Sequence, residues 1–437
     1  MFPEISALTT LINRTPSFKL LISRIQKSDD DFWLVGGCLR NSLLHLPQVD
    51  IDIACSGDPT PLAQAWGEEV SGHWFWLDAK RRQSRVLSPS GLSFDFSPLR
   101  AASITADLQL RDFTINALAL PLNEFFPDSE FLDPLAGVSH LQQKQLQSCS
   151  PRSFLDDPLR MLKGIRHAVT LGFTLSDSTQ KQMISSKHLL ANIAGERIRD
   201  ELSKIFDSKN IIKGIELLVD TELLGALFGS AGSDWNKQTA IDAINRLEVT
   251  LHDVGQESVA NISNSRKPEV FSNRAIFLLT QFLKHYSSSG LAELLQRRLR
   301  LSRQQQRLIK ELLADPSLDI LSLAPSIEGQ RPQALLVEKQ EPFSAEKMFY
   351  WGVCENRLTL ERTLQLQKSF ARMQKFGRVP NLLNGREISS LLGSSSNIQI
   401  GKWQSRLKLA EINGEITTKL QAENWLKSKL PFDNQEA

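Results

Sequence analysis

Short runs of β-rich sequence occupy the first part of the chain, from Asp31 to about Ala119. The runs FWLVGG, VDIDIAC, WFWLD, RVLS and LSFDFS contain many β-branched and aromatic residues, and stretches with helical character separate them. This arrangement is typical of a mixed sheet packed with helices. The pattern therefore predicts an α+β domain in this part of the chain.

From about Ser153 onward the period of the hydrophobic residues changes. They recur at steps of three and four positions, as at Leu159, Leu162 and Ile165, which is the period of helices with one buried face. Strand patterns almost vanish, so the remainder is predicted to be helical. The polar segment from Asp253 to Asn273 lacks this period and predicts a loop between helical bodies.

Composition narrows the class of protein. A length of 437 residues exceeds one ordinary hydrophobic core, so two or more domains are expected. The four cysteines form no CxxC pair, which argues against a zinc site or a disulfide scaffold. No leader pattern and no run of about 18 apolar residues occurs. We expect an unprocessed cytoplasmic protein that has no membrane association.

Two aspartates in the run VDIDIAC indicate a metal site. Asp50 and Asp52 are two positions apart, so on a strand both point to one face while Ile51 and Ile53 anchor the other. Converging carboxylates suit Mg²⁺, which prefers oxygen ligands and keeps waters or substrate phosphates. Two such ions would activate an attacking hydroxyl and a leaving pyrophosphate. The alternative for this pair is an ordinary solvated strand face.

Two further features fit the same chemistry. Gly36 and Gly37 precede a short helix, so the backbone can approach a phosphate, and Arg40 on that helix adds positive charge. In LSFDFSPLR the two phenylalanines point one way and Asp95 the other, which makes Asp95 a candidate third carboxylate. A plain turn and an exposed strand aspartate are the respective alternatives.

The sequence LVGGCLRNSLLHLPQVDIDIACSG resembles the first signature of class II tRNA nucleotidyltransferases and bacterial poly(A) polymerases. Three further motifs follow in the family's order: RDFTINALAL, DDPLRMLKGIRHAVTLGF and ERIRDEL. The resemblance implies a nucleotidyltransferase head, or palm, at 1–150, followed by an all-helical neck at 151–210, a body at 211–310 and a tRNA-binding tail at 311–437. It implies an enzyme that extends the 3′ end of tRNA with CTP, and with ATP in full CCA-adding members.

The resemblance also implies roles for individual residues. Asp50 and Asp52 would hold two Mg²⁺ ions, and Asp95 would complete the catalytic carboxylates. The residues implied for the triphosphate and the ribose are Gly36, Gly37, Arg40, Arg111, Asp112 and Asn116. An aspartate suits the ribose because it accepts a hydrogen bond from a 2′-hydroxyl, although Asp112 is equally suited to capping a helix.

The third motif predicts a polar strip on a helix, in which Asp157, Arg160, Lys163 and Arg166 step by three positions. An aspartate and an arginine can pair with the edge of a base, so we assign base selection to Asp157 and Arg160. Taken alone, the strip also fits an ordinary surface helix with Asp–Arg pairs. The accompanying motifs favour nucleotide selection.

Several positions depart from the family pattern. Asn41 replaces an aspartate, Leu110 and Lys163 replace arginines, and Asp156 replaces a glutamate. Only AASITADLQL separates SPLR from RDFT, whereas full CCA-adding members carry a longer loop there that helps the switch from CTP to ATP. The short connection predicts addition of two cytidines. A full CCA-adding enzyme and a poly(A) polymerase remain alternatives.

Basic residues in the helical part are candidates for contact with the tRNA backbone. A predicted helix carries Arg297, Arg298 and Arg303, and a later one carries Lys402 and Arg406 beside Trp403. Solvated helix faces are the alternative. Two further hypotheses remain: an inactive RNA-binding relative, which the intact aspartates disfavour, and an enzyme acting on a small acceptor, which has no need of the long helical part.

Overall fold

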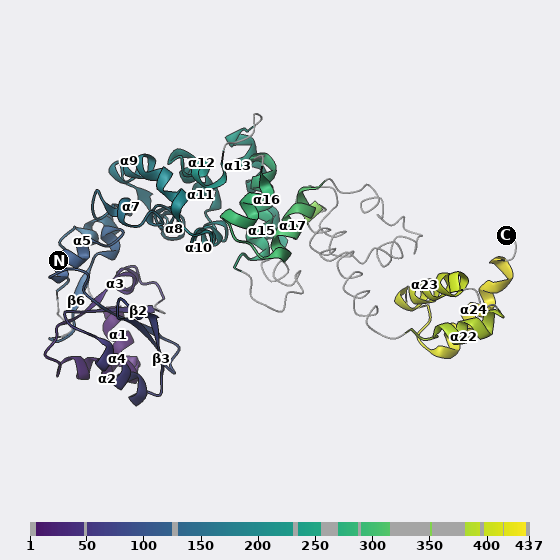
Figure 1. Cartoon of the computed structure of the whole chain (residues 1–437), viewed down its shortest axis with the longest axis horizontal. Helices are drawn as coiled ribbons and strands as arrows, with labels where there is room; N and C mark the ends of the chain where they lie inside the picture. The colour runs from purple at the N-terminus through teal and green to yellow at the C-terminus, as the bar shows by residue number, and fades with distance from the viewer. Residues whose placement is uncertain are drawn as a thin grey trace. The chain divides into compact units, whose positions relative to one another are not determined.

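The computed structural model describes residues 6–47, 50–124, 130–229, 235–254, 270–286, 290–314, 350–351, 381–393, 397–413 and 415–433. The chain forms two compact units (Figure 1). The first comprises Met1–Ala231 together with Arg297–Arg300, and the second comprises Gly232–Gln296 together with Leu301–Ala437. The finer division into head, neck, body and tail stays a prediction. Most of the polar segment 253–273 lies outside the described residues.

A six-stranded mixed sheet forms the base of the first unit, in the order β3-β4-β5-β2-β1-β6. The strands are β1 (Phe32–Val35), β2 (Asp50–Cys55), β3 (His73–Asp78), β4 (Gln83–Leu87), β5 (Ser93–Pro98) and β6 (Ala119–Pro121). β2 and β5 are parallel, and the other neighbouring pairs are antiparallel. The sheet confirms the α+β prediction for this part of the chain.

One face of the sheet is buried under α2 (Pro16–Ile25) and α4 (Thr60–Glu69). Alternation along β2 and β5 sends Ile53 and Phe94 to this face, where they are fully buried. The Phe94 ring lies 5.1 Å from that of Phe18 and 4.8 Å from that of Trp66. This aromatic packing fixes β2 and β5, and thereby the direction of the polar residues that alternate with the buried ones.

The opposite face is covered only in part. α5 (Ile104–Gln109) packs on the β1 and β6 side, where Val35, Ala54, Leu108 and Ala119 form a hydrophobic cluster. The polar side chains of β2, β4 and β5 point to the same face. This part of the sheet is the floor of the site described below.

The rest of the first unit is almost entirely helical. Its helices are α1 (Ser6–Arg14), α3 (Gly37–Leu43), η1 (Thr114–Asn116), α6 (Gly137–Gln142), α7 (Ser153–Asp156), α8 (Arg160–Leu171), α9 (Asp177–Ser186), η2 (Lys187–Asn192), α10 (Gly195–Phe206), α11 (Ile211–Asp220) and α12 (Leu223–Phe228). One short strand pair, β7 (Gln145–Leu146) with β8 (Thr174–Leu175), adds to the predicted helical pattern. α8 packs against α10 and α11.

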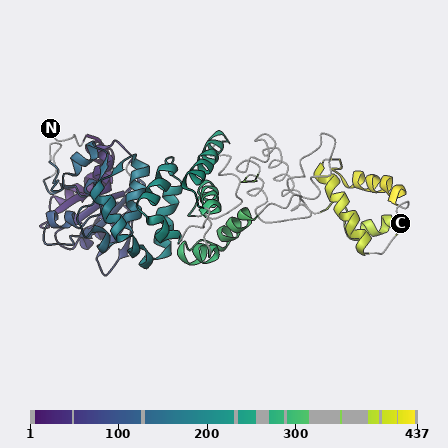
Figure 2. The same cartoon turned by 90° about the horizontal axis from the view of Figure 1, so that it is seen from above.

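The described part of the second unit is helical. It contains α13 (Lys237–Val254), α15 (Asn273–Tyr286), α16 (Leu291–Glu293), η3 (Leu294–Arg298, of which the last two residues belong to the first unit), α17 (Arg303–Leu313), α22 (Gly385–Leu392), α23 (Asn397–Asn413) and α24 (Lys419–Asp433). The last three helices lie together (Figure 1 and Figure 2). They enclose their own hydrophobic core around Ile388, Trp403 and Leu426. None of the helices that the structure describes has both the length and the apolar character needed to span a bilayer.

Candidate active site

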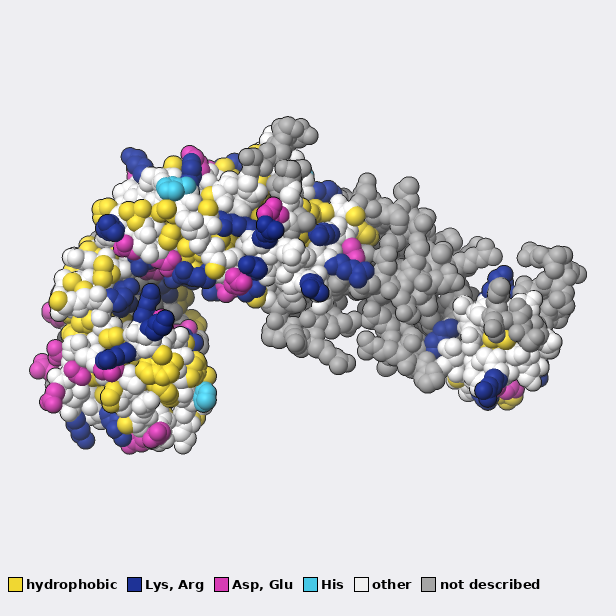
Figure 3. Space-filling model, in the orientation of Figure 1, with side chains coloured by type: hydrophobic (Ala, Val, Ile, Leu, Met, Phe, Trp, Pro, Cys, Tyr) yellow, Lys and Arg dark blue, Asp and Glu magenta, His cyan; other side chains and the backbone are white. Residues whose placement is uncertain are grey.

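A cavity of about 410 Å³ opens in the first unit above the open face of the sheet. Five segments that lie far apart along the chain line it: β1, β2, the β3–β4 hairpin, the stretch 95–116 and the stretch 157–163. The lining includes Asp52, Asp95, Arg100, Asp107, Arg111, Asp112, Asn116, Asp157, Arg160 and Lys163. Figure 3 shows Lys and Arg side chains gathered where the surface of this unit is hollowed. A polar cavity with several cations is suited to an anionic ligand.

Strand register brings two of the predicted carboxylates together. Asp52 on β2 is the direct partner of Asp95 on the parallel strand β5, so both side chains leave the sheet on the cavity side. Burial and then the Asp95 carboxylate raise the pKa of Asp52 to about 6. Asp50 lies opposite Ser93 and is exposed. Asp50 is not among the residues that line the cavity.

Arg85 is a partner of Asp95 that the sequence pattern did not indicate. It lies directly opposite Asp95 on the antiparallel strand β4. Its Nε donates to Asp95 Oδ1 at 2.6 Å and its Nη2 to Oδ2 at 2.7 Å, a two-pronged ion pair. Among the described residues, no three acidic, histidine or cysteine side chains are grouped to hold a metal ion.

The glycine turn supports the carboxylates. Gly36 has φ of +80°, a conformation that favours glycine, and a Cβ there would lie 2.9 Å from Asp52 Oδ2. The predicted helix is α3, but it begins one residue earlier than predicted, because Gly37 is its first residue and Gly36 alone precedes it. Arg40 on that helix donates to Asn116 Oδ1 at 2.6 Å and to Asn41 Oδ1 at 2.8 Å. The residue that departs from the family pattern, Asn41, therefore still accepts from this arginine.

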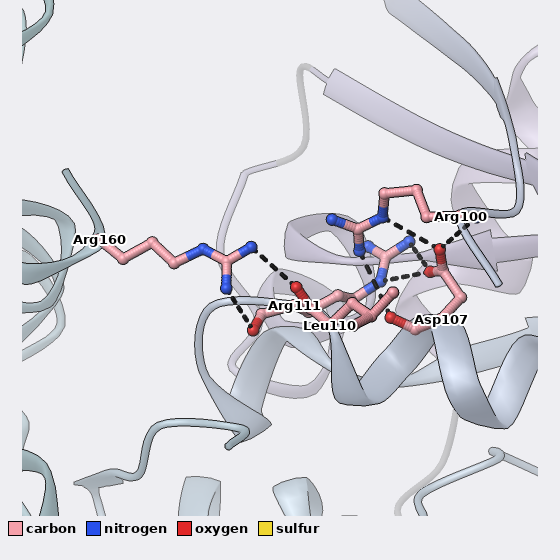
Figure 4. Close-up of polar contacts among 5 residues, drawn as sticks. All are labelled: Arg100, Asp107, Leu110, Arg111 and Arg160. Carbon is pink, nitrogen blue, oxygen red and sulfur yellow. Dashed lines mark hydrogen bonds and ion pairs between the residues drawn. The ribbon is translucent and has the colours of Figure 1, made fainter. Parts of the chain in front are cut away.

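Asp107 fastens two arginines at the wall of the cavity (Figure 4). Its Oδ1 accepts from the backbone N of Arg100 at 3.0 Å and from Arg100 Nε at 3.1 Å, and its Oδ2 accepts from Arg111 Nη2 at 3.1 Å. Burial raises the pKa of Asp107, but the neighbouring Arg111 and Arg100 outweigh that effect and lower the pKa. The turn after β5 is thus tied to the RDFT motif.

Asp112 is held as a carboxylate inside the protein. It accepts hydrogen bonds from the backbone N of Phe113 at 2.8 Å and from Asn116 Nδ2 at 3.0 Å. Burial raises the pKa of Asp112, but the electrostatic influence of His167 and Lys163, together with these hydrogen bonds, lowers it to about 2. Asp112 is not the N-cap of an α-helix that the structure describes. It lies two residues before the short 3-10 helix η1, whose N-cap is Phe113.

The polar strip of the third motif is shorter than the sequence predicted. Arg160, Lys163 and Arg166 belong to α8, but Asp157 precedes that helix in an extended conformation, with φ of −146° and ψ of 99°. The reason is Pro158, whose ring disfavours helical geometry at the preceding residue. Asp157 still lines the cavity, and Arg197 Nη2 donates to its Oδ2 at 3.0 Å.

Arg160 is directed at main-chain oxygens. Its Nη2 donates to the carbonyl of Leu110 at 2.7 Å, and its Nη1 donates to the carbonyl of Arg111 at 3.1 Å (Figure 4). The side chain of Ser153 also accepts from Nη1, at 3.2 Å. A guanidinium has five N–H donors. These bonds therefore leave donors of Arg160 for a ligand in the cavity.

The last member of the strip faces away from the cavity lining. Arg166 Nε donates to Glu201 on α10 at 2.7 Å, and Arg166 Nη2 lies 3.2 Å from His167 Nε2. Lys163, one turn earlier, lines the cavity. The structure thus brings Asp157, Arg160 and Lys163 to one cavity and leaves Arg166 in a neighbouring helix contact.

The predicted basic helix around Arg297 consists of two separate segments. η3 ends at Arg298, and α17 begins at Arg303 after Ser302, whose side chain accepts from the backbone N of Gln305. Ser302 followed three residues later by Gln305 is a helix-start signal that divides the segment. Arg298 donates to the carbonyls of Leu190, Ala191 and Ala226 at 2.8 to 3.2 Å, so its guanidinium is occupied within the first unit.

The other basic candidates are exposed. Arg303 is exposed at the start of α17, and Lys402 and Arg406 are exposed on α23. The Arg406 guanidinium lies 4.8 Å from the ring centre of Trp403, which is itself buried in the core of the last three helices. Arg297 belongs to the first unit together with Arg298.

Comparison with known proteins places these motifs in a family. Residues 32–147 match the family described as the poly(A) polymerase head domain. Residues 172–231 match the family described as a probable RNA and SrmB-binding site of polymerase A. The two matched segments carry the sheet of the site and the helices that follow α8.

Individual relatives cover most or half of the chain. The CC-adding tRNA nucleotidyltransferase of Geobacter sulfurreducens is 33% identical over 409 residues, with 91% of each chain covered. The CCA-adding enzyme of Anoxybacillus flavithermus is 33% identical over 225 residues, which is 47% of this chain and 54% of that protein. The Thermotoga maritima CCA-adding enzyme complexed with tRNA has the same fold, with a TM-score of 0.69 at 23% identity and coverage of 97% and 98%.

Proposed function

This chain belongs to the class II tRNA nucleotidyltransferases, and we propose that it adds two cytidines from CTP to the 3′ end of tRNA. It is a template-independent transferase whose substrates are tRNA and nucleoside triphosphates. The observation that carries the cytidine specificity is the short connection 101–110 between β5 and the RDFT motif, which consists mainly of α5 and whose Asp107 binds Arg100. A full-length relative described as CC-adding supports the same specificity. A cytoplasmic location stays a prediction.

The reaction is an in-line substitution at phosphorus. The tRNA 3′-hydroxyl attacks the α-phosphate of the nucleotide, one P–O bond forms, the bond to pyrophosphate breaks, and the hydroxyl proton leaves. Catalysis then consists of positioning and charge stabilisation. Arg100, Arg111 and Lys163 line the cavity and would bind the negative charge of the triphosphate.

The family is metal-dependent, and the donors present here fit a hard cation. Burial and the adjacent Asp95 make the negative charge of Asp52 unfavourable, and a bound divalent ion would offset this cost. Asp50 and Asp52 would hold it, and we propose two Mg²⁺ ions, because carboxylate oxygens are the ligands that Mg²⁺ prefers. When bound, such ions neutralise the triphosphate and lower the pKa of the attacking hydroxyl. Asp95 would join them on release from Arg85.

Asp157 and Arg160 are the proposed readers of the base. Aspartate accepts from the exocyclic amine of cytosine, and the free N–H groups of Arg160 suit its acceptor atoms. Both side chains line the cavity, and each is fixed by a protein partner, Arg197 for Asp157 and main-chain carbonyls for Arg160. Fixed donors and acceptors can select a base without a nucleic-acid template.

Further side chains would position the rest of the nucleotide. Asp112 is the proposed acceptor for the ribose 2′-hydroxyl, with Asn116 holding it from within the protein. Arg40 and Arg166 would act from behind the cavity wall, Arg40 through Asn116 and Arg166 by holding α8 against α10 through Glu201. Gly36 and Gly37 would let the backbone approach the phosphates, since neither has a side chain. A Cβ at Gly36 would in addition lie 2.9 Å from Asp52 Oδ2 and disturb that carboxylate.

The test uses three tRNA transcripts, ending at the discriminator base, at the first cytidine and at the second. Purified protein with Mg²⁺ receives labelled CTP, labelled ATP or both, and product length is read on a gel. Two cytidines with no adenosine are expected. A complete CCA end or a long adenosine tail would overturn the cytidine specificity and keep the family. An Asp52→Asn variant, expected to be slower by about 100-fold or more, controls for contaminating activity.

A further inference from the structure

The hairpin between β3 and β4 presents a basic tip beside the cavity. Lys80, Arg81 and Arg82 are consecutive and exposed, and the side chains of Arg81 and Arg82 are 78% and 61% accessible. Leu77 and Gln83, which flank the tip, both line the cavity together with Asp52 and Asp95. Arg81 Nε lies 3.6 Å from Asp78 Oδ2, so the tip carries three cations and one aspartate. A net positive charge therefore adjoins the cavity carboxylates in a chain whose formal net charge is only +2.

The conformation of the tip is fixed by local hydrogen bonds. Asp78 Oδ1 accepts from the backbone N of Lys80 at 3.0 Å and from that of Arg81 at 3.2 Å. Arg82 has φ of +53° and pairs with Asp58 at 3.0 Å, which ties the tip to the start of α4. The tip is thus ordered in advance, so little conformational entropy is lost when a ligand binds.

An apolar side chain accompanies these charges. Leu77 is 47% exposed although it borders a strongly polar cavity. The pairing of β3 with β4 shifts register between Trp76 and Asp78, the two residues on either side of Leu77. Single exposed leucines are common on protein surfaces. A leucine next to a run of cations at an active-site rim, however, matches a ligand that has both flat apolar parts and regularly spaced anions.

We propose that the β3–β4 hairpin binds the single-stranded 3′ end of tRNA. Lys80 and Arg81 neutralise backbone phosphates, and Leu77 packs against a base next to the terminal nucleotide. Single-stranded RNA is bound in this way, by cations that follow the backbone and apolar side chains that contact the bases. The inference rests on the proposed function, because the 3′-hydroxyl must reach the cavity that Leu77 and Gln83 border.

The test measures tRNA affinity without catalysis. Full-length protein binds, in fluorescence anisotropy, a 5′-labelled tRNA ending in CC or the same tRNA trimmed to a blunt acceptor stem. The variant Lys80→Gln/Arg81→Gln retains Arg82 and all backbone hydrogen bonds of the tip. Its matched control is Lys19→Gln/Lys27→Gln, which removes equal charge from exposed positions on and just after α2, the helix on the far face of the sheet.

The hairpin variant is expected to bind the CC-ended tRNA about tenfold more weakly. The slope of log Kd against log salt concentration should also be smaller by about 1.4, because two phosphate contacts are lost and each contributes about 0.7 on a single strand. Leu77→Ser should weaken the same complex about threefold. Neither variant should change affinity for the blunt tRNA. Equal losses in the control, or losses of equal size on both RNAs, would overturn the proposal. Labelled CTP incorporation by the wild type, measured in parallel, tests the proposed function separately.

Discussion

Burial makes the ionised form of Asp52 unfavourable in the folded chain. Its pKa is raised from 3.8 to about 6, so between those values the folded state binds more protons than the unfolded state. The contribution of Asp52 to the free energy of unfolding then falls as pH rises from about 4 to about 6. A divalent ion at this position would reverse the effect, because it favours the ionised form.

Asp52→Asn should therefore stabilise the metal-free protein by about 3 kcal/mol at pH 7. Urea unfolding of the wild type and the variant at several pH values measures this difference, which should vanish near pH 4. The control is Asp29→Asn, at an exposed aspartate. Mg²⁺ should raise the unfolding temperature of the wild type and not of the Asp52 variant. Equal stabilisation of both proteins by Mg²⁺ would exclude Asp52 as the ligand.

Asp107 joins the turn after β5 to the RDFT motif through two arginines. Its side chain is only 2% accessible, and Asp107→Asn removes the carboxylate that pairs with both Arg100 and Arg111. We expect a loss of about 2 kcal/mol in stability and a higher KM for CTP. Asp156→Asn breaks an exposed pair with Arg152 and should change neither quantity. A stable Asp107→Asn protein with an unchanged KM would show that this junction does not shape the nucleotide pocket.

At the scale of elements, Pro158 separates α7 from α8 and thereby sets the conformation of Asp157. Pro158→Ala removes the restriction and permits the two helices to join. We expect weaker discrimination of CTP against UTP, by about tenfold, because a displaced Asp157 no longer meets the exocyclic amine. The ratio of kcat/KM for the two nucleotides measures it. Pro61→Ala, in the first turn of α4, is the matched control and should leave the ratio unchanged.

The sheet and the helical remainder were predictable because the hydrophobic residues in each part recur with the spacing typical of strands or of helices, and this spacing is visible in a single sequence. The alternation that points Asp52 and Asp95 away from the buried phenylalanines is such a local signal. Their ionic partners are not, since Arg85 is 10 residues from Asp95 and Arg197 is 40 residues from Asp157. Strand register and helix packing create these pairs. The end of the polar strip at Asp157, by contrast, could have been predicted from Pro158 alone.

On the scale of the whole molecule, the cavity and its lining belong to the first unit, while exposed basic residues on α23 belong to the second. We propose that Lys402 and Arg406 bind the tRNA backbone remote from the 3′ end, with Arg297 and Arg303 as further candidates. Arg298 is a weaker candidate, because three carbonyl groups of the first unit already occupy it.

Lys402→Gln/Arg406→Gln should weaken binding of CC-ended and blunt tRNA alike, by about tenfold at physiological salt. Anisotropy titrations of the full chain with both RNAs measure this. Lys427→Gln/Lys429→Gln removes equal charge from exposed positions on α24 of the same three-helix bundle. Loss restricted to the CC-ended RNA, or equal loss in the α24 variant, would contradict a specific role for α23.

The way in which Arg160 is anchored makes the pocket tolerant of side-chain mutations next to the anchor. Its guanidinium is held by the main-chain oxygens of Leu110 and Arg111, and every amino acid supplies such an oxygen. A change of side chain at position 110, where the family pattern has arginine and this chain has leucine, therefore leaves the anchor in place. Base recognition is therefore insulated from side-chain changes at position 110, although Arg111 has a role of its own in the cavity.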